Sequence, residues 1–368
     1  MPKIRVLIVD DAVVVRRLVS DCLASDPDIE VAGTAASGSI ALAKLDQLNP
    51  DIVTLDIEME TMDGIETLAA IRAKRPKLPV IMFSTLSERG AAITLDALAK
   101  GANDYVTKPA NVGSVNAAMQ RVREELIPKI KALCGRVPIP QPLAAERVVE
   151  QKKLASMPLP TGTAGVLAIG VSTGGPNALA ELLPLLAANF PVPILIVQHM
   201  PPLFTKLLAK RIATVTEKPT REGENGAALS AGGIWLAPGG FHMEVERNGH
   251  GSRLRIHEEP PENSCRPAVD VLFRSVAKVY GPRALAVVLT GMGQDGLIGS
   301  RHIREAGGRV LAQDEASSVV WGMPGAVAQA GLAHKTLPLD GLAAEINRLA
   351  GQEARTAQLD LPHLVSAS

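Results

Sequence analysis

Short runs of β-branched and aliphatic residues alternate with longer segments of helical periodicity through the first third of the chain. Five such runs recur at nearly regular spacing, a pattern typical of a parallel sheet covered by helices on both faces. We therefore expect a doubly wound α/β domain with five parallel strands. The expected strands cover residues 5–9, 30–33, 51–55, 80–83 and 105–107.

A linker then separates this region from a second one. A helix expected over residues 114–133 runs past the first sheet, and residues 135–142 contain three prolines, too many for regular structure. We assign residues 1–125 to the first domain and 126–160 to a helical extension and proline-rich linker. Residues 161–352 form the second domain, and 353–368 a flexible tail.

The second domain repeats the alternation of strands and helices. We expect an α/β fold with a mainly parallel sheet, joined by a β-hairpin around Asn248-Gly249. The expected sheet strands cover residues 165–171, 193–198, 233–236, 284–289 and 309–313.

Composition narrows the function classes. The chain has 38 basic and 38 acidic residues and only 2% aromatic residues, so neither a basic field nor stacking platforms favour nucleic acid. The three cysteines lack the spacing of a zinc site, which favours a reduced, cytoplasmic protein. The N-terminus reaches acidic residues after one short apolar run, so we expect neither a signal peptide nor an integral membrane protein.

Chemistry-bearing side chains stand at the expected carboxyl ends of the first strands, where doubly wound sheets place functional groups. Three carboxylates at one edge repel one another unless a cation lies among them, and their hard oxygens suit Mg²⁺. Such a site can accept a phosphoryl group while the metal, a lysine and a hydroxyl neutralise the new charge. The residues concerned are Asp10, Asp11, Asp56, Ser84, Thr85 and Lys108.

Together with Met62-Asp-Gly64, Tyr105 and Lys108-Pro109, these residues resemble the response-regulator receivers, a flavodoxin-like family, across residues 1–125. The resemblance implies phosphorylation at Asp56, a set of metal ligands and a switch that reports the phosphoryl group. The implied ligands of Mg²⁺ are Asp10, Asp11, Asp56 and the backbone carbonyl of Glu58, and the implied switch residues are Ser84, Thr85, Tyr105 and Lys108. Glu60 stands where the family usually has proline, so we expect a less rigid loop after Asp56.

A second group of candidate residues follows strands of the second domain. Gly170-Val-Ser172-Thr-Gly174 fits G-x-S-x-G, in which a tight strand-to-helix turn presents a hydroxyl beside helix N–H donors. Taken alone, this turn is equally well explained by helix capping or by phosphate binding. A serine nucleophile needs a base and an acid that orients the base. His199 ends the next strand and Asp295 follows the strand at 284–289, so both are expected at the same sheet edge.

This order of residues, with its surrounding motifs, resembles the chemotaxis-specific protein-glutamate methylesterases, the CheB family, over residues 165 to about 350. The motifs are Ser172-Thr-Gly-Gly-Pro, Gln198-His-Met-Pro201, Leu236-Ala-Pro-Gly239, Cys265-Arg-Pro-Ala-Val-Asp-Val-Leu-Phe273, Gly291-Met-Gly-Gln-Asp295 and Gly322-Met-Pro324.

The resemblance implies a role for each candidate. Ser172 would be the nucleophile, His199 the base and acid, and Asp295 the residue that orients His199. The remaining implied residues are Thr173 and Met292, whose backbone N–H groups would hold the oxyanion, and Arg266, at the mouth of the substrate cleft. Ala268 stands where a serine is common, which bears on substrate contacts and not on the triad.

The implied activity is phosphorylation-activated hydrolysis of glutamyl methyl esters on methyl-accepting chemoreceptors, with deamidation of receptor glutamines by the same acyl chemistry, which gives adaptation. A chemotaxis histidine kinase is the implied phosphoryl donor. Mg²⁺ is the implied cofactor of the receiver, and the esterase reaction is expected to need none. The unphosphorylated receiver is expected to pack against the catalytic domain and to obstruct its cleft.

Two alternatives stay open at this point. The second domain is either a catalyst or a non-catalytic module that binds a phosphate or a partner through the Ser-Thr-Gly-Gly turn. The second alternative is a methylesterase that serves a chemosensory pathway other than motility. A DNA-binding regulator is disfavoured, because the strand-rich, charge-neutral second half offers no basic recognition helix.

Overall fold

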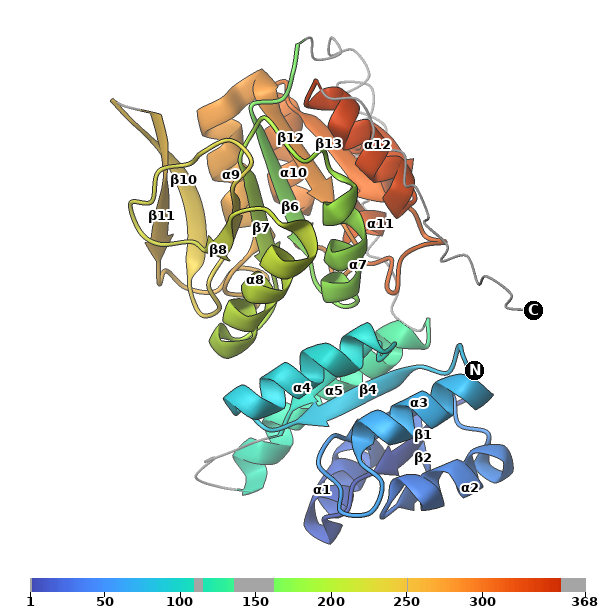
Figure 1. Ribbon diagram of the computed structural model, residues 1–368. Helices are drawn as coiled ribbons and strands as arrows, with labels where there is room; N and C mark the ends of the chain where they lie inside the picture. The colour runs from blue at the N-terminus through green and yellow to red at the C-terminus, as the bar shows by residue number, and fades with distance from the viewer. Residues whose placement is uncertain (1, 109–114, 136–161, 250, 352–368) are drawn as a thin grey trace, which may run out of the picture.

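A computed structural model describes residues 2–108, 115–135, 162–249 and 251–351, which form two α/β domains packed on each other (Figure 1). The N-terminal domain, coloured blue to blue-green, lies below the C-terminal domain, coloured green to red. Residues 136–160 of the expected linker, the expected tail, Pro109 and Ser114 lie outside the described residues.

The N-terminal sheet has five parallel strands in the order β2-β1-β3-β4-β5, so the prediction for this domain is confirmed. The strands are β1 (Ile4–Val9), β2 (Ile29–Ala35), β3 (Ile52–Asp56), β4 (Val80–Ser84) and β5 (Asp104–Thr107). The helices are α1 (Val13–Ala24), α2 (Gly38–Leu48), α3 (Gly64–Lys74), α4 (Glu88–Ala99) and α5 (Val115–Leu133).

Alternating side chains of β1 explain why its sequence is an almost continuous apolar run. Ile4, Val6 and Ile8 share a core with residues of α1 and α5, whereas Leu7 and Val9 pack with residues of α2, α3 and α4 on the opposite face. Both faces of the strand are therefore buried, as is usual in parallel sheets.

The C-terminal sheet has seven parallel strands in the order β14-β13-β12-β6-β7-β9-β8. The strands are β6 (Val166–Val171), β7 (Ile194–Gln198), β8 (Thr220–Glu222), β9 (Ile234–Leu236), β12 (Ala284–Val288), β13 (Arg309–Gln313) and β14 (Lys335–Leu337). The helices are α7 (Gly175–Leu182), α8 (Pro202–Thr216), α9 (Val269–Tyr280), α10 (Leu297–Glu305), α11 (Met323–Gln329) and α12 (Leu339–Leu349), with 3₁₀ turns η1 (Leu183–Leu185) and η2 (Gly281–Arg283).

The pattern of hydrophobic residues did not reveal two of these strands, β8 and β14. Both lie at the edges of the sheet, are three residues long and consist of Thr-Arg-Glu and Lys-Thr-Leu. Short, charged strands are common at sheet edges, where one side of the backbone faces solvent. Their sequences therefore lack the apolar run that marks the five inner strands.

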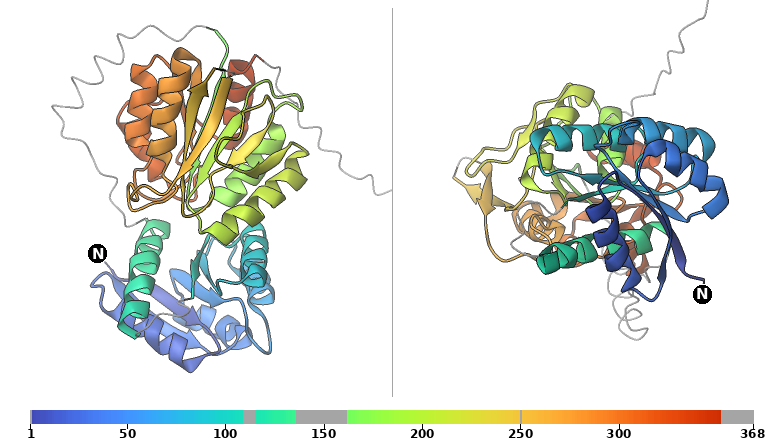
Figure 2. Two further views of the ribbon diagram at one scale, coloured as in Figure 1. Left: turned by 90° about the vertical axis from the view of Figure 1, so that its left-hand side faces the viewer. Right: turned by 90° about the horizontal axis from the view of Figure 1, so that it is seen from below.

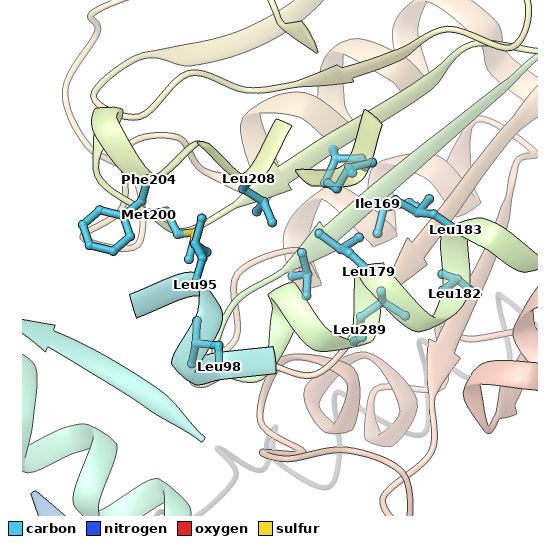
Figure 3. Close-up of a cluster of buried hydrophobic side chains, with 14 of the residues drawn as sticks. Leu95, Leu98, Ile169, Leu179, Leu182, Leu183, Met200, Phe204, Leu208 and Leu289 are labelled. Atoms are coloured by element: carbon cyan, nitrogen blue, oxygen red, sulfur yellow. The ribbon is translucent and has the colours of Figure 1, made fainter. Parts of the chain in front are cut away.

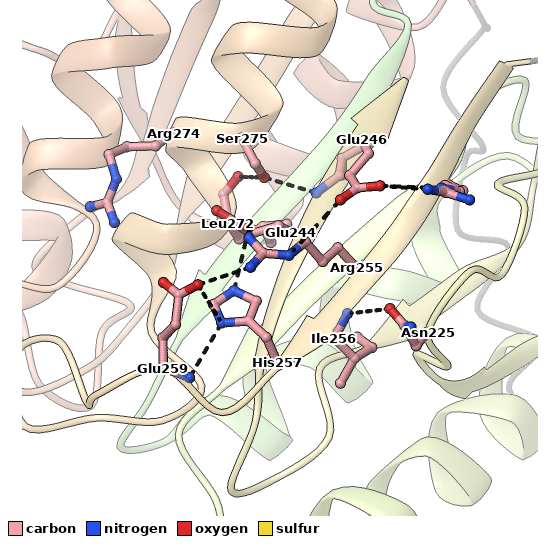
Figure 4. Close-up of polar contacts among 12 residues, drawn as sticks. Asn225, Glu244, Glu246, Arg255, Ile256, His257, Glu259, Leu272, Arg274 and Ser275 are labelled. Atoms are coloured by element: carbon pink, nitrogen blue, oxygen red, sulfur yellow. Dashed lines mark hydrogen bonds and ion pairs between the residues drawn. The ribbon is translucent and has the colours of Figure 1, made fainter. Parts of the chain in front are cut away.

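The expected hairpin is present as a separate antiparallel pair, β10 (His242–Asn248) and β11 (Gly251–His257). It packs on α9, where the backbone N–H of Val245 donates to Ser275 Oγ over 3.0 Å. Figure 4 shows Arg255 of β11 between two carboxylates, Glu244 at 2.6 Å and Glu259 at 2.9 Å. The hairpin thus extends the domain on the side of α9 without joining the main sheet.

Buried side chains of both domains belong to one hydrophobic cluster. Within it, α4 of the N-terminal domain contacts α7 and α8 of the C-terminal domain. Figure 2 shows the domains stacked along this boundary from two further sides. In Figure 3, Leu95 of α4 lies beside Met200 and Phe204 of the C-terminal domain. Burying such side chains stabilises a contact by roughly 1.5–3 kcal/mol each, so this boundary is an ordered interface.

No helix within the described residues is both long and apolar enough to cross a membrane.

The environment of His334 predicts a pH-dependent stability. Its Nδ1 accepts from the backbone N–H of Val310 over 3.1 Å, and burial together with the nearby Arg304 guanidinium lowers the pKa of His334 to about 4 from its usual 6.5. Between pH 4 and pH 6.5, His334 binds a proton in the unfolded chain but stays neutral in the folded chain. The free energy of unfolding therefore falls as the pH drops from 6.5 to 4, by about 1–2 kcal/mol after allowance for solvent screening.

We expect His334→Asn, which keeps an acceptor for Val310 but cannot be protonated, to reduce this decline in denaturant melts at pH 7, 5.5 and 4.5. His302→Asn, at an exposed histidine of α10, is the matched control. Equal declines in the wild type and in His334→Asn would contradict this assignment.

Candidate active site and receiver site

The acidic residues of the N-terminal domain meet where its strand order reverses, between β1 and β3. Asp10 and Asp11 follow β1 and Asp56 ends β3, and one ligand atom from each lies within 4.8 Å of the others. Groups placed at such a switch point lie in the crevice outside the carboxyl ends of the strands. The sequence prediction that these three carboxylates converge is therefore confirmed.

Asp56 is almost completely buried, and Lys108 lies against it. Lys108 Nζ is 2.7 Å from Asp56 Oδ2 and 3.1 Å from Asp10 Oδ2. Burial, with the Asp10 charge in support, raises the pKa of Asp56 to about 6 even though Lys108 opposes this change. One lysine does not neutralise three neighbouring carboxylates. Their hard oxygen donors fit a divalent cation such as Mg²⁺.

The predicted switch residues do not all lie at this edge. Ser84 ends β4 with its Oγ 2.6 Å from Thr94 Oγ1 of α4, and Thr85 Oγ1 lies 3.2 Å from Ser87 Oγ. Tyr105, in β5, instead stacks on Phe204 of the C-terminal domain, with 4.5 Å between ring centroids. The backbone N–H of Glu58, a predicted metal ligand through its carbonyl, donates to Asp56 Oδ1 over 3.2 Å.

A second switch point lies in the C-terminal sheet, between β6 and β12. Ser172 follows β6, Asp295 follows β12, and His199 follows β7, the neighbour of β6 on its other side. His199 Nε2 lies 2.8 Å from Asp295 Oδ2, and Ser172 and His199 line one cavity. The sequence prediction that these residues share one sheet edge is confirmed, and their catalytic roles stay predictions.

Asp295 is held as an ionised carboxylate by the start of α9. Its Oδ2 accepts from the backbone N–H of Val269 over 2.7 Å, and its Oδ1 accepts from the N–H groups of Asp270 and Gly296. Burial opposes the charge, but the contact with His199 and these N–H donors lower the pKa of Asp295.

Ala268 is the N-cap of α9 and has no side chain able to cap it, so Asp295 supplies the acceptor from another segment. Ala268 is also completely buried. Its departure from the common serine therefore exposes no altered surface to a substrate.

The imidazole of His199 has one nitrogen left for a nucleophile. Because Nε2 faces Asp295, this nitrogen is Nδ1, and its partner here is Cys265 Sγ at 3.6 Å. No hydrogen bond joins Ser172 Oγ to His199 among the described residues. Burial disfavours the imidazolium, but Asp295 and Cys265 outweigh it and raise the pKa of His199 above 6.5.

The turn that carries Ser172 is tightly packed. Gly174 adopts a left-handed conformation (φ 78°) directly before α7, and Gln198 Nε2 donates to the backbone carbonyl of Ser172 over 3.0 Å. A side chain at Gly291 would meet Ser172 Cβ at 2.9 Å, so the loop carrying Met292 approaches the nucleophile turn closely. Thr173 and Met292, which the family resemblance implies as oxyanion donors, therefore lie on two loops that approach each other closely.

The N-terminal domain reaches this turn directly. Thr173 Oγ1 donates to Asp104 Oδ2 over 2.7 Å, and Asp104 Oδ1 pairs with Lys129 at 3.0 Å. Asn177 of α7 donates to the backbone carbonyl of Leu98 over 2.7 Å. Three elements of the N-terminal domain, α4, β5 and α5, therefore form a wall of the site that holds Ser172.

A cavity of about 430 Å³ opens beside His199 between the two domains. Tyr105 and Lys129 line it from the N-terminal domain, and Cys265 and Arg266 line it from the C-terminal domain. Arg266 lies at this cleft as expected, but its guanidinium donates to the backbone carbonyls of Glu258 and Glu259. In this arrangement the arginine supports the cleft loop.

Comparison with known proteins identifies both halves of the chain. The family model described as CheB methylesterase matches residues 167–346, and the response regulator receiver domain model matches residues 6–120. A protein-glutamate methylesterase/protein-glutamine glutaminase of Trichodesmium erythraeum is 54% identical over 95% of this chain and 100% of its own length. The chain belongs to this methylesterase/glutaminase family.

A second curated relative agrees with this assignment. A protein of the same name from Nocardioides is 56% identical over 96% of this chain and 97% of its own length. The crystal structure of the Thermotoga maritima CheB methylesterase catalytic domain is 37% identical and covers 52% of this chain and 99% of that chain, with a TM-score of 0.49.

Three polar residues near the triad were not predicted from the sequence. Asp104 belongs to a strand that is remote in sequence from the triad, and Cys265 was recognised only as part of a motif. Asn263, whose Nδ2 donates to Asp295 Oδ1 over 2.9 Å, had no predicted role. Only the folded arrangement brings them to Thr173, His199 and Asp295. The left-handed backbone at Asn263 (φ 53°) has no unambiguous sequence signal.

The pairing of Cys265 with His199 makes it necessary to test which side chain is the nucleophile. We expect Ser172→Ala to lower turnover by at least about a thousandfold and Cys265→Ala to retain it, because removal of the thiol leaves Nδ1 free for Ser172.

Mass spectrometry of the chain treated with a fluorophosphonate should locate the adduct on Ser172 in the wild type and in Cys265→Ala. An adduct on Cys265, or normal turnover in Ser172→Ala, would contradict the serine assignment.

Proposed function

We propose that this chain is a phosphorylation-activated protein-glutamate methylesterase and protein-glutamine glutaminase, which demethylates and deamidates methyl-accepting chemotaxis receptors. The observation that carries the proposal is 54% identity, over the full length of the relative, to a protein of that name. The site supports it, because a serine, a histidine paired with a carboxylate and a glycine-rich loop meet at one sheet edge.

The proposed reaction has two steps that use the same residues. Ser172 Oγ attacks the ester carbonyl of the glutamyl side chain while His199 Nδ1 takes the hydroxyl proton, and Thr173 and Met292 N–H groups bind the oxyanion. His199 then passes the proton to the departing methoxide, which leaves as methanol. Water repeats the attack on the acyl-enzyme, which frees the glutamate carboxyl and restores Ser172. With a glutamine, ammonia leaves in place of methanol.

The proposed regulation begins at Asp56, which accepts a phosphoryl group from a chemotaxis histidine kinase. Asp10, Asp11, Asp56 and the backbone carbonyl of Glu58 would hold Mg²⁺, which neutralises phosphate charge when bound. Lys108, Ser84 and Thr85 would face the new group. The proposed domains are the receiver at residues 1–125 and the catalytic domain at 161–352, joined by the segment 126–160.

A route between the two sites follows β5. Lys108 beside Asp56 comes directly after β5, and Asp104 beside Thr173 is the first residue of the strand, so roughly 13 Å of extended chain joins them. Phosphorylation removes one Asp56 oxygen from its pairing with Lys108. A shift of β5 would then disturb the Tyr105–Phe204 stack and the Asp104–Thr173 hydrogen bond together.

The test is methanol release from methylated receptor membranes, measured with and without a small-molecule phosphoryl donor. The wild type should release methanol faster with the donor and Mg²⁺, whereas Asp56→Asn should stay at the basal rate. A protein that only binds receptors releases no methanol, and that outcome would refute the proposed enzymatic activity. A donor that stimulates Asp56→Asn as strongly as the wild type would refute Asp56 as the phosphorylation site.

A further inference from the structure

A second carboxylate lies beside the triad and takes no part in the proposed reaction. Asp270 is almost completely buried in the first turn of α9, and its Oδ1 accepts from the backbone N–H of Gly299 over 2.6 Å. Burial, followed by the charge of Asp295, raises the pKa of Asp270 to about 6. Two carboxylates that are close together in a poorly solvated region repel unless donors lie between them.

The amide of Asn263 lies between them. Its Nδ2 donates to Asp295 Oδ1 over 2.9 Å and to Asp270 Oδ2 over 2.9 Å, so each carboxylate receives a donor from one nitrogen. Among the hydrogen bonds of the described residues, Asn263 and His199 are the side chains that donate to Asp295. A donor lost from a buried carboxylate costs more than an average hydrogen bond contributes.

The backbone around Asn263 is arranged to present this amide. Its φ of 53° lies in the left-handed region, which asparagine tolerates better than most residues. The preceding Glu262 forms two contacts with the Arg274 guanidinium, one of 2.7 Å, and pairs with Cys265 in an isolated bridge. The same loop carries Cys265 and Arg266 to the cleft, so it links the cleft wall to the triad.

We propose that Asn263 is a positioning residue of the triad, whose amide bridges Asp295 and Asp270 and so fixes the carboxylate that orients His199. The proposal rests on the proposed esterase function and adds a residue to it. Without the bridge, Asp295 loses a donor on the oxygen that does not bind His199 and faces Asp270 directly. The three backbone N–H donors to Asp295 remain, but repulsion from Asp270 shifts the carboxylate and His199 moves with it. The loss therefore falls on the chemical step and not on receptor binding.

The most direct variant is Asn263→Gly in the full chain, because glycine accepts the positive φ and only the amide is removed. With a phosphoryl donor present, kcat for methanol release should fall by about 10- to 100-fold, since small misplacements of catalytic groups have effects of this size. KM should stay within about twofold of the wild type. Asn263→Asp keeps the shape of the side chain but replaces the donor with a carboxylate, so its kcat should fall at least as far as that of Asn263→Gly.

Asn225→Ala is the matched control. Asn225 Oδ1 accepts a hydrogen bond from the backbone N–H of Ile256 over 3.1 Å, at the hairpin and away from the triad (Figure 4). This variant should retain the kcat of the wild type. Equal losses in Asn225→Ala and Asn263→Gly would overturn the positioning role.

A rescue separates positioning from a merely structural role. Asp270→Asn removes the second charge and places an amide where the Asp270 carboxylate was, so in the Asn263→Gly background it should raise kcat at least about fivefold. If Asn263→Gly lowered kcat only by destabilising the fold, the second substitution Asp270→Asn would not restore kcat. The inference is overturned if Asn263→Gly keeps kcat within twofold of the wild type, or if the double variant is no faster than Asn263→Gly.

The rate at which a fluorophosphonate labels Ser172 gives the same comparison without a receptor. If the wild type released no methanol, the proposed substrate would be wrong. Slower labelling of Asn263→Gly than of the wild type would still support the positioning role, and equal labelling would contradict it.

Discussion

The hydrogen bond from Thr173 to Asp104 is the contact on which the relation between the two halves of the chain depends. It joins the turn that carries Ser172 to the first residue of β5, and it is buried together with the Tyr105–Phe204 stack. A charged acceptor in such a place holds its donor more firmly than a neutral one. With this contact in place, the receiver forms one wall of the candidate active site, and His199 lines a cavity that opens between the domains.

Two buried carboxylates show how the surroundings of a side chain set its charge. Asp56 lies in a site with few donors, so burial dominates and raises its pKa to about 6. Asp295 is equally buried, but it meets three backbone N–H groups, Asn263 and His199, and its pKa is lowered. In the proposed function, the same residue type would serve a metal-dependent reaction in one domain and the orientation of a base in the other.

The sequence predicted the groups that strands bring together and missed those that meet through tertiary packing. Asp56 ends an apolar strand, Ser172 directly follows one, and Asp295 lies in the loop after a third. Because parallel strands end at a common edge, their convergence could be predicted from periodicity and order alone. Asp104 stands at the opposite end of its strand, and its contact with Thr173 depends on how two domains pack.

The two edge strands β8 and β14 were missed for a different reason, because their three-residue polar sequences carry no strand signal. The pairing of Cys265 with His199 follows from a loop conformation between β11 and α9 that no periodic pattern encodes. The candidate site residues at strand ends could thus be predicted from the sequence, whereas the tertiary contacts made by Asp104 and Cys265 could not.

The most direct test of this account is the methanol-release rate of unphosphorylated Asp104→Ala. Loss of a buried hydrogen bond to a charged group, worth roughly 1.5–3 kcal/mol, should shift the docking equilibrium at least about tenfold and raise the basal rate toward that of the phosphorylated wild type. Asp46→Ala, which removes an exposed carboxylate of the same domain paired with Arg75, should stay at the wild-type basal rate. If Asp104→Ala stays there too, while the phosphoryl donor still stimulates the wild type, the contact does not restrain the enzyme and the account is wrong.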